Sequence, residues 1–415
     1  MSFYGIQDCR ACGYNVLNQV LDFGDQLVSD FVADSKSDGI SAPLVLVRCE
    51  KCGLVQLKHT VDRKLIYKKY WYESGINESM VRALRDITIA VIDHAELSTG
   101  DWVLDIGSND GTLLDQYPSS YNTVGIEPSD LALKSCHDGS ESCRKHSIIQ
   151  GFFEPNLPFI DGQFKAITAI AMFYDLERPN EFLQEVKRLL HKDGVFVIQM
   201  NDLLSMITNK TWDNIGHEHL EYYTFTTLRP LLEWNGLYPY HVEFNEVNGG
   251  SMRVYIRHFK GPESMRVRKS LEETLANEKF IDELRLQLYG IEIAESATKL
   301  TRFVDREIAN GKRIYGLGAS NRGNTILQYL GFGPEHIVAI ADRNPSKHGL
   351  FTPTKIPIIS EEQMRSDNPD YLFVLPYHFL EGIKEREKEY LAKGGKFIVP
   401  IPFPRVISKD GVEYL

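Results

Sequence analysis

Residues 102–111 read WVLDIGSNDG, an apolar strand that runs directly into a loop with two glycines. Three further apolar runs, at 122–128, 166–172 and 194–200, alternate with segments of helical periodicity. Apolar strands that alternate with helices are typical of a parallel sheet with both faces covered. Residues 101–257 are therefore predicted to form an α/β unit that binds a ligand at the carboxyl ends of its strands.

The same rhythm returns near the C-terminus, where a second α/β unit is predicted from the apolar runs 313–319, 336–342, 371–376 and 396–402. Residues 81–99 have the periodicity of an amphipathic helix. Residues 262–310 are charged, nearly free of glycine and helical in pattern, so they predict one or two connecting helices. We therefore predict four parts in chain order: an N-terminal lobe (1–60), a ligand-binding α/β domain (61–260), connecting helices (261–310) and a second α/β domain (311–415).

The composition of the 415 residues, 43% hydrophobic and 25% charged, is that of a globular protein and excludes global disorder. The 46 lysines and arginines against 57 aspartates and glutamates give a net charge of −11. A chain this acidic lacks the basic face needed to wrap nucleic acid or coat an anionic membrane. No apolar run reaches the roughly 18 residues of a membrane-spanning helix, and the first residues lack a signal-peptide core. We expect a soluble, cytoplasmic enzyme, a monomer or small homo-oligomer, that binds neither nucleic acid nor membranes.

Four of the six cysteines form two Cys-x-x-Cys pairs, Cys9 with Cys12 and Cys49 with Cys52, each followed by glycine. Two such knuckles can place four thiolates tetrahedrally around Zn²⁺, and the glycines permit the tight turns that this requires. A redox Cys-x-x-Cys is the rival interpretation, but redox motifs rarely occur as a matched pair. We predict a structural zinc site with four protein ligands and no open, catalytic position.

The loop after the strand at 102–107 is predicted to bind a nucleoside. Gly107 allows a sharp turn and a close approach of a ligand to the backbone. Glu127, 22 residues beyond Asp105 at the end of the next strand, is placed to bind two ribose hydroxyls. The loop lacks the glycine pattern of dinucleotide-binding proteins and the lysine of a phosphate loop. S-adenosylmethionine, a nucleoside with an amino-acid tail, therefore fits the loop better than a ligand with a phosphate tail. The alternative interpretation is a polar loop that only caps a helix. The predicted cofactor contacts are Asp105, Gly107, Ser108, Asn109, Asp110, Gly111, Glu127 and Pro128, with Phe152 as an aromatic candidate for the adenine ring or the core and Phe173 as a candidate for the cofactor edge.

These motifs resemble the bacterial sugar C-methyltransferases, class I S-adenosylmethionine-dependent enzymes that act on nucleotide-linked 4-keto-deoxysugars. The resemblance spans nearly the whole chain and rests on the cysteine pairs, SNDG (108–111) and HEH (217–219). Further marks are NGGS (248–251), GLGA (316–319), GNT (323–325), DRNP (342–345) and VPIP (399–402). The resemblance implies an α/β protein with a zinc-binding lobe, a central class I methyltransferase domain and a C-terminal Rossmann-like domain.

In this family the last histidine of HEH is the general base, which maps to His219. Methylation of a carbon requires removal of a proton that a neighbouring ketone has acidified, and a histidine that titrates near neutrality suits this step. Glu218 would orient or polarise the groups at the reaction centre, and His217 would either bind substrate or pack within the protein. A metal site is disfavoured because three adjacent residues cannot all face one ion. A tyrosine that usually precedes the triplet is replaced by Gly216, and Tyr222 is a candidate for its role.

The sugar nucleotide is expected in a cleft between the central and C-terminal domains, roofed by the zinc lobe. The glycines of the C-terminal loop would open a helix N-terminus that attracts the diphosphate, Arg322 would add a charged clamp, and Asp342 would bind a hydroxyl. The predicted substrate contacts are Tyr70, Tyr72, Glu73, Asn248, Gly318, Arg322, Asn324, Asp342 and His378. Glu73 and Asn248 stand where the family often has histidine.

The sequence therefore leads us to expect a C-methyltransferase that uses S-adenosylmethionine and methylates the carbon alpha to a ketone, C3, through enolisation by His219. An O- or N-methyltransferase with the same cofactor is the alternative, kept open by Gly216 and Glu73. A zinc-dependent scaffold that has lost catalysis is a third hypothesis, against which the intact SNDG and HEH motifs argue.

Overall fold

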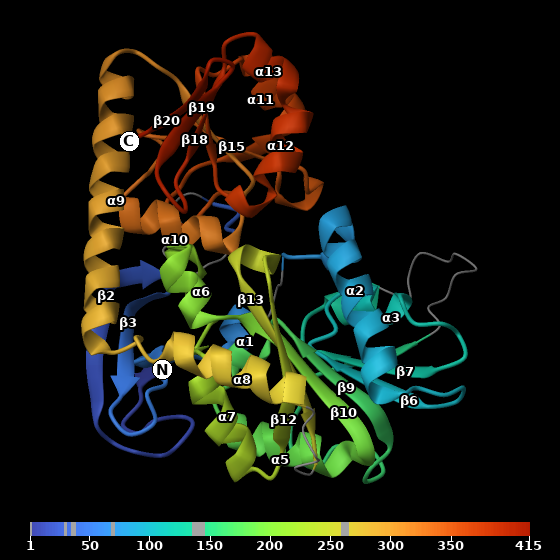
Figure 1. Cartoon of the computed structure of the whole chain (residues 1–415). Coiled ribbons are helices and arrows are strands. Elements are labelled where there is room, and N and C mark those ends of the chain that lie inside the picture. Colours follow the sequence, from blue (N-terminus) through green and yellow to red (C-terminus); the bar gives the residue numbers. More distant parts are fainter. Residues whose placement is uncertain (1, 29–30, 35–38, 68–70, 135–145, 259–264) are drawn as a thin grey trace.

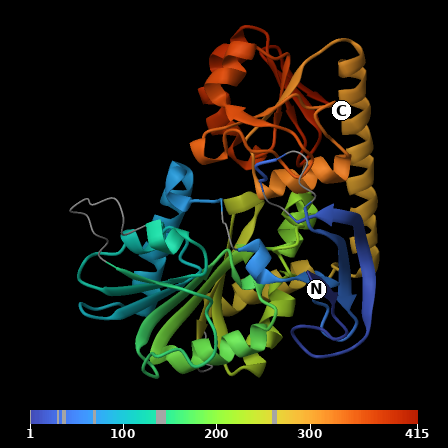
Figure 2. The ribbon, with the colours of Figure 1, turned by 180° about the vertical axis from the view of Figure 1, so that it is seen from behind.

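The computed structural model describes residues 2–28, 31–34, 39–67, 71–134, 146–258 and 265–415. Within these residues it contains two seven-stranded sheets, a four-stranded sheet and a two-stranded sheet. Figure 1 shows the C-terminal sheet, in red, at one end of the molecule and the central sheet, in cyan and green, at the other. The blue N-terminal strands lie beside the central part, and the long helix α9 (Glu283–Ala309) runs along one side of the molecule (Figures 1 and 2).

The central sheet has the strand order β12-β13-β10-β9-β6-β7-β8. Its strands are β6 (Trp102–Ile106), β7 (Asn122–Glu127), β8 (Ser147–Gln150), β9 (Phe164–Ile170), β10 (Leu190–Asn201), β12 (Tyr238–Asn245) and β13 (Ser251–Arg257). Strands β6 to β10 pair in parallel, in agreement with the prediction. The hairpin β12–β13 is antiparallel, which the strand–helix rhythm does not predict. The NGGS motif forms the turn of this hairpin, and its first three residues all have positive φ.

Helices pack on both faces of the central sheet because side chains alternate along each strand. Val103 of β6 packs in the cluster that contains Ile87 of α2, whereas Leu104 packs in the cluster of α5 and α7. The helices of this part are α2 (Glu78–Ala95), α3 (Thr112–Asp115), α4 (Leu131–Lys134), α5 (Pro179–Leu189), α6 (Leu203–Thr208) and α7 (Phe225–Trp234), with short 3-10 helices η1 (Ser74–Ile76), η2 (Phe173–Asp175), η3 (Trp212–Asn214) and η4 (Val247–Gly249). The helix predicted at 81–99 is α2, which begins three residues earlier and ends at Ala95, followed by Glu96 as a C-cap with a left-handed φ of 49°.

The N-terminal lobe shares a sheet with the central part of the chain. Its elements are β1 (Phe3–Gly5), β2 (Leu17–Leu27), β3 (Ser41–Cys49), β4 (Val55–Leu57), β5 (His59–Val61) and α1 (Arg63–Ile66), and β1 pairs with β5. The four-stranded sheet has the order β11-β4-β3-β2, and β11 (Glu221–Tyr222) begins two residues after the last histidine of the HEH triplet. The HEH segment is thereby fixed at the junction of the two lobes, where the Leu57 N–H also donates to the Leu220 carbonyl at 2.9 Å.

The C-terminal sheet has the order β16-β15-β14-β17-β18-β19-β20. Its elements are β14 (Ile314–Leu317), α10 (Asn321–Leu330), β15 (Ile340–Asp342), η5 (Pro345–Lys347), β16 (Ile358–Ser360), α11 (Glu361–Asp367), β17 (Tyr371–Val374), η6 (Tyr377–Phe379), α12 (Leu380–Arg386), α13 (Lys388–Ala392), β18 (Lys396–Val399), β19 (Arg405–Ser408) and β20 (Gly411–Tyr414). The four predicted strands, β14, β15, β17 and β18, form a parallel sheet to which β16 is added beside β15. Strands β19 and β20 extend the other side of the sheet as an antiparallel edge that the sequence does not predict.

Two helices, α8 (Met265–Glu278) and α9, occupy the segment that the sequence assigns to connecting helices. Helix α9 does more than connect, because it packs closely on β2: a Cβ built on Gly290 would lie 2.7 Å from a methyl of Leu21. The apolar cluster around α9 joins residues of the N-terminal sheet to the core of the C-terminal sheet. In the described part of the chain, no helix combines the length and apolar character that a membrane crossing requires.

Candidate functional site

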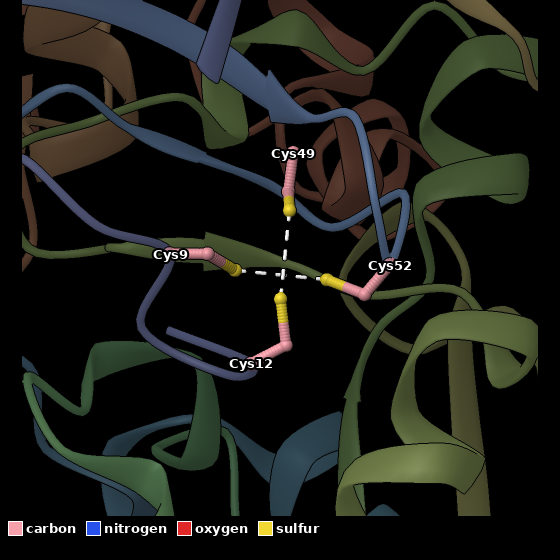
Figure 3. Close-up of side chains that lie close together, drawn as sticks. All are labelled: Cys9, Cys12, Cys49 and Cys52. Carbon is pink, nitrogen blue, oxygen red and sulfur yellow. Dashed lines mark hydrogen bonds between the residues drawn. The ribbon is translucent and has the colours of Figure 1, made fainter. Parts of the chain in front are cut away.

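The four cysteine sulfurs point toward one centre (Figure 3). All four lie within 4.8 Å of one another, and the Cys9–Cys52 and Cys12–Cys49 sulfur pairs are each 3.6 Å apart. In each knuckle the glycine after the pair has positive φ and donates its N–H to the carbonyl of the first cysteine. Four converging thiolates are the ligand set of a closed structural zinc site, so the residues fit the predicted metal.

The loop after β6 is held by the carboxylate of Glu127 at the end of β7. The Asn109 N–H donates to Glu127 Oε2 at 2.8 Å, and the Ser129 N–H donates to Oε1 at 2.9 Å. Charge-assisted hydrogen bonds of this kind are among the strongest in proteins, so one carboxylate fixes both the cofactor loop and the residues after β7.

Asp105 and Gly107 shape the floor of this loop. The Asp105 carboxylate accepts a hydrogen bond of 2.6 Å from Thr168 Oγ1, and burial raises its pKa to about 7. Gly107 has a φ of 72°, and a Cβ built there would lie 3.0 Å from Met172 Cγ. A side chain at position 107 would therefore be strained and crowded, which leaves the backbone open to a ligand.

A cavity of about 440 Å³ runs along the carboxyl ends of the strands. The predicted cofactor residues that line it are Asp105, Gly107, Ser108, Asn109, Glu127, Pro128 and Phe152. The predicted substrate residues that line it are Tyr72, Glu73, Asn248, Gly318, Arg322, Asp342 and His378, and it is also lined by Glu218 and His219. The cavity therefore brings together residues of the central and C-terminal domains, with Phe31 from the N-terminal lobe. Tyr70 lies outside the described residues.

Some predicted cofactor residues have other places in the structure. Asp110 accepts hydrogen bonds from Thr112 and from the Gly75 N–H, and Gly111 is the N-cap of α3, so both residues build the loop rather than line the cavity. Phe173 is fully buried and packs against Phe182. Phe173 therefore packs in the core and does not lie at the cofactor edge that the sequence predicts for it.

The segment before α2 docks on the cofactor loop. The Asn109 side chain donates to the Tyr72 carbonyl at 2.9 Å and accepts from the Ser74 N–H at 3.0 Å. This contact carries Tyr72 and Glu73 to the cavity wall.

His219 lies at the centre of the cavity with one ring nitrogen engaged. Its Nδ1 is 2.6 Å from the carbonyl oxygen of Asn214, so Nδ1 carries the proton and donates it, and Nε2 keeps a free lone pair. Nε2 lies 3.8 Å from Glu218 Oε1, and burial lowers the pKa of His219. Asn321 donates to the other oxygen of Glu218 at 3.1 Å. The arrangement is that of a neutral imidazole ready to accept a proton beside a carboxylate.

His217 turns away from this centre. Its Nε2 is 3.0 Å from the carbonyl oxygen of Ala42 in β3, and the residue is buried outside the main cavity. Burial lowers the pKa of His217, so the neutral ring donates to that carbonyl. Of the two roles expected for His217, packing between the lobes is the one that fits its position.

Tyr222 is also displaced from its predicted role. Its ring is 3% exposed, its hydroxyl is sealed without a hydrogen-bond partner in the described part of the chain, and it does not line the cavity. The pairing of β11 with β4 turns this side chain into the apolar cluster between the lobes. Tyr174, which the sequence analysis does not single out, lines the cavity instead, with its ring edge-on to His219 at 4.5 Å between centroids.

Tyr174 and the neighbouring Asp175 follow β9 and so lie where strand ends meet the cavity. Asp175 Oδ2 accepts a hydrogen bond of 2.8 Å from the Tyr67 hydroxyl, and burial raises the pKa of Asp175 well above its usual range. The signal used for Asp105 and Glu127, a polar side chain at the carboxyl end of a buried strand, would find both residues only if it were extended to the loop after the strand, because they follow the last residue of β9 by four and five positions.

The C-terminal loop is held by Asp342 in the way that the first loop is held by Glu127. Asp342 accepts from the N–H groups of Ala319 and Asn344, both at 2.8 Å, and its Oδ2 lies 3.4 Å from Lys347 Nζ. Lys347 and Arg343 line the cavity and are further residues that the sequence analysis does not single out. Asn324, in contrast, is buried in α10 away from the cavity wall.

Arg322 is committed to contacts within the protein. Its Nε lies 2.8 Å from Asp213 Oδ2, and its two terminal nitrogens donate to the Asn248 carbonyl at 2.9 Å and the Tyr377 hydroxyl at 3.0 Å. The Tyr377 hydroxyl in turn donates to Asp213 Oδ1 at 3.0 Å. Arg322 thus ties the C-terminal lobe to the 3-10 helix that precedes HEH, rather than standing free as a phosphate clamp.

His378 lines the cavity near Arg322. Burial, with the Arg322 charge adding to it, lowers the pKa of His378 to about 3. The ring is therefore neutral at physiological pH and offers a hydrogen bond rather than a charge.

Three family descriptions match consecutive parts of the chain. A zinc binding domain matches residues 9–67, a methyltransferase domain matches residues 77–242, and a C-methyltransferase C-terminal domain matches residues 246–402. Among curated proteins, the C-methyltransferase NovU of Streptomyces niveus is 30% identical over 419 residues, which cover 98% of each chain. The matches include the cysteine cluster, the first loop and the second loop in turn.

Solved structures of methyltransferases and of other proteins are similar to less than half of the chain, and two of them serve as examples. The PH0226 protein of Pyrococcus horikoshii is 17% identical with a TM-score of 0.37, and the match covers 45% of this chain and 94% of that one. An S-adenosylmethionine-dependent methyltransferase of Clostridium acetobutylicum is 13% identical with a TM-score of 0.36, over 44% of this chain and 96% of that one.

Proposed function

This chain belongs to the family of C-methyltransferases with an N-terminal zinc-binding domain, and on that premise we propose that it methylates the carbon alpha to the ketone, C3, of a nucleotide-linked 4-keto-deoxysugar. The enzyme depends on S-adenosylmethionine, and its family supports carbon over oxygen or nitrogen as the acceptor atom. When bound, S-adenosylmethionine supplies a methyl group carried on a sulfonium sulfur, and the sulfur keeps the electron pair of the carbon–sulfur bond when that bond breaks. The chain's own residues therefore have to position the ligands and make the acceptor carbon nucleophilic.

The observation that carries the proposal is the state of His219. The Asn214 carbonyl holds the proton on Nδ1, so Nε2 is the atom that accepts a proton from the acceptor carbon. When that carbon–hydrogen bond breaks, its electron pair moves into the enolate, and the carbon becomes the nucleophile. Glu218, 3.8 Å from Nε2, stabilises the imidazolium that forms.

The acids of the first loop suit the cofactor. Glu127 would hold the ribose hydroxyls, and Asp105 would favour a cationic ligand in its ionised form. Met172, which lies over Gly107, and Phe152 supply apolar surface at the same end of the cavity.

The cations of the second loop support a sugar nucleotide as the other ligand. Arg343 and Lys347 line the cavity beyond the N-terminus of the ten-residue helix α10, where free N–H groups and the helix dipole favour an anion. A diphosphate bound here would leave its sugar on the side of the cavity that holds His219.

The test is an incubation of the protein with S-adenosylmethionine and a panel of thymidine-, guanosine- and cytidine-linked 4-keto-6-deoxyhexoses in deuterated buffer, followed by mass spectrometry. We expect a product about 14 mass units heavier than the substrate, with no deuterium at the methylated carbon because the methyl group replaces its hydrogen, and deuterium at that carbon in recovered substrate. His219→Gln is expected to lose both signals by about 10³-fold, within the range of general-base catalysis, and to keep cofactor binding. His191→Gln, at the opposite end of β10 from the cavity, is the matched control and is expected to behave as wild type.

Two outcomes would contradict the proposal. Methyl transfer without exchange at the acceptor carbon would contradict enolisation. Full turnover by a His219→Gln variant that binds both ligands would contradict the assignment of the base.

A further inference from the structure

Two buried tyrosines, Tyr174 and Tyr222, differ in whether their hydroxyl groups reach the cavity. The Tyr222 hydroxyl is sealed from the cavity and has no partner within the described residues. Tyr174 is 6% exposed and lines the cavity, and its hydroxyl forms no hydrogen bond within the described part of the chain, yet it is not among the sealed atoms. The free phenol beside His219 is therefore that of Tyr174.

The surroundings of Tyr174 keep it a hydrogen-bond donor. Burial raises the pKa of Tyr174 well above its usual range, and the charges of Asp175 and Glu218 add to this effect. The phenol therefore stays protonated over the whole pH range in which a histidine base works. The Arg322 guanidinium, which opposes this shift, contributes positive potential on the same side of the cavity.

The proposed reaction creates a demand for such a donor. As a proton leaves the acceptor carbon for His219, negative charge develops on the carbonyl oxygen, and a preorganised donor in a dry site stabilises that charge. Glu218 cannot serve as a donor while it is ionised. Gly216 offers no side chain, and its Cβ position faces Thr325 rather than the cavity centre.

We propose that the Tyr174 hydroxyl donates a hydrogen bond to the carbonyl oxygen of the acceptor as that oxygen becomes an enolate. The assignment rests on the proposed ketone acceptor. The Tyr174 proton stays on the phenol throughout, the carbon proton goes to His219 Nε2, and the carbon–hydrogen electrons pass through the enolate into the new carbon–carbon bond. Tyr174 thereby takes the role for which the sequence analysis names Tyr222.

The test compares Tyr174→Phe with Tyr222→Phe, which each remove one hydroxyl from a buried ring. For Tyr174→Phe we expect kcat and the rate of solvent exchange into recovered substrate to fall together by about 10²-fold, the effect of one lost oxyanion donor. The Kd for S-adenosylmethionine should stay within twofold, and the pH profile limb that reports His219 should not move, because the ring that packs on His219 is kept. Tyr222→Phe should keep more than a third of wild-type turnover. Thermal unfolding of each variant within about 2 °C of wild type shows that the fold is kept.

The outcomes separate this inference from the proposed function. Suppose that wild type methylates a ketone of the panel. If Tyr174→Phe then retains a third or more of the wild-type turnover, or if Tyr222→Phe loses turnover instead, the assignment of Tyr174 as the donor is overturned while the proposed ketone acceptor stands. A shift of the His219 limb in Tyr174→Phe would show a positioning role and overturn direct donation. If wild type neither methylates nor exchanges any panel ketone, the proposed acceptor falls first and this assignment with it.

Discussion

The loops after β6 and β14 have the same backbone geometry and opposite surroundings. Each loop begins with a glycine at positive φ, 72° at Gly107 and 84° at Gly318. Each glycine N–H donates to a carbonyl of the adjacent strand, Ile126 at 2.8 Å and Ala341 at 2.7 Å. Both strands lie where the order of the sheet reverses, with later strands added on the other side, which is the place where α/β sheets bind ligands.

The side chains around the two loops differ in charge. The acids Glu127, Asp105 and Glu73 line the cavity at the first loop, where Arg63 is paired with Glu154. At the second loop it is lined by the cation Arg343, which has no ion pair within the described residues, and by the paired cations Arg322 (with Asp213), Lys347 (with Asp342) and Arg386 (with Glu361). The shared backbone therefore provides a similar turn at both ends, and the proposed division of the cavity, a sulfonium-bearing nucleoside at the first loop and a diphosphate at the second, follows the difference in charge.

The largest effect is expected at the ion pair of Arg322 and Asp213, which joins the C-terminal lobe to the segment before HEH. Arg322→Gln should lower the free energy of unfolding by about 3 kcal/mol or more, because it leaves the buried Asp213 carboxylate without its cation. Turnover should fall, since Asp213 precedes the residue whose carbonyl holds His219, whereas KM for the sugar nucleotide should stay within threefold. Denaturant unfolding and steady-state kinetics measure both quantities.

The Asp213→Asn, Arg322→Gln double variant is the control for this prediction. We expect it to recover part of the lost stability, because neither partner then leaves an unpaired buried charge. A rise in KM with unchanged stability would instead identify Arg322 as the phosphate clamp that the sequence suggests.

The next effect separates the strand-end acids. Glu127→Ala should weaken S-adenosylmethionine binding by about 100-fold, which is about 2.7 kcal/mol, because it removes the acceptor of two backbone N–H groups and of the ribose hydroxyls. Titration calorimetry measures the Kd. Asp342→Asn is the matched variant at the second loop and should leave that Kd within twofold. Equal losses from both variants would contradict the assignment of different ligands to the two loops.

Much of the fold can be predicted because its signals are local. A strand buried on both faces is a continuous apolar run, so eight strands of the two sheets appear in the sequence, and the cysteine knuckles reveal a zinc site by spacing. The antiparallel strands β11, β12, β13, β19 and β20 are not predicted, because short edge or hairpin strands have no helix between them to mark the rhythm.

The residues of the site are harder to predict, because their partners lie far apart in the chain. Arg322 and Asp213 are 109 residues apart, so nothing local indicates that the guanidinium is already occupied. Tyr222 lies closer to HEH than Tyr174 does, but the two-residue strand β11 turns its side chain away from the cavity. Strand-end position thus predicts site residues well, whereas sequence proximity does not.

A smaller effect is expected from the free cation at the second loop. Arg343 is exposed at the cavity wall and has no ion pair within the described residues, so Arg343→Gln should weaken binding of thymidine, guanosine or cytidine diphosphate by about tenfold. S-adenosylmethionine binding should not change. Arg302→Gln, an exposed position on α9 outside the cavity, is the matched control. Loss of cofactor binding in Arg343→Gln would reverse the proposed division of the cavity.

The smallest effect is a pH dependence that only the first loop should show. The pKa of Asp105 is about 7 in the folded protein and about 3.9 in an unfolded chain, so the folded state holds the extra proton between these values and its stability falls as pH rises through them. Ionised Asp105 favours a cationic ligand, so affinity for S-adenosylmethionine should rise about fourfold from pH 6.5 to pH 8. Asp105→Asn should flatten this profile in calorimetry. In the second loop the corresponding position, two residues before the turn glycine, is occupied by Gly316, which has no ionisable side chain. Affinity for the sugar nucleotide should therefore not follow the pH profile of cofactor binding. The same pH profile for both ligands would mean that both ends of the cavity depend on one ionisation.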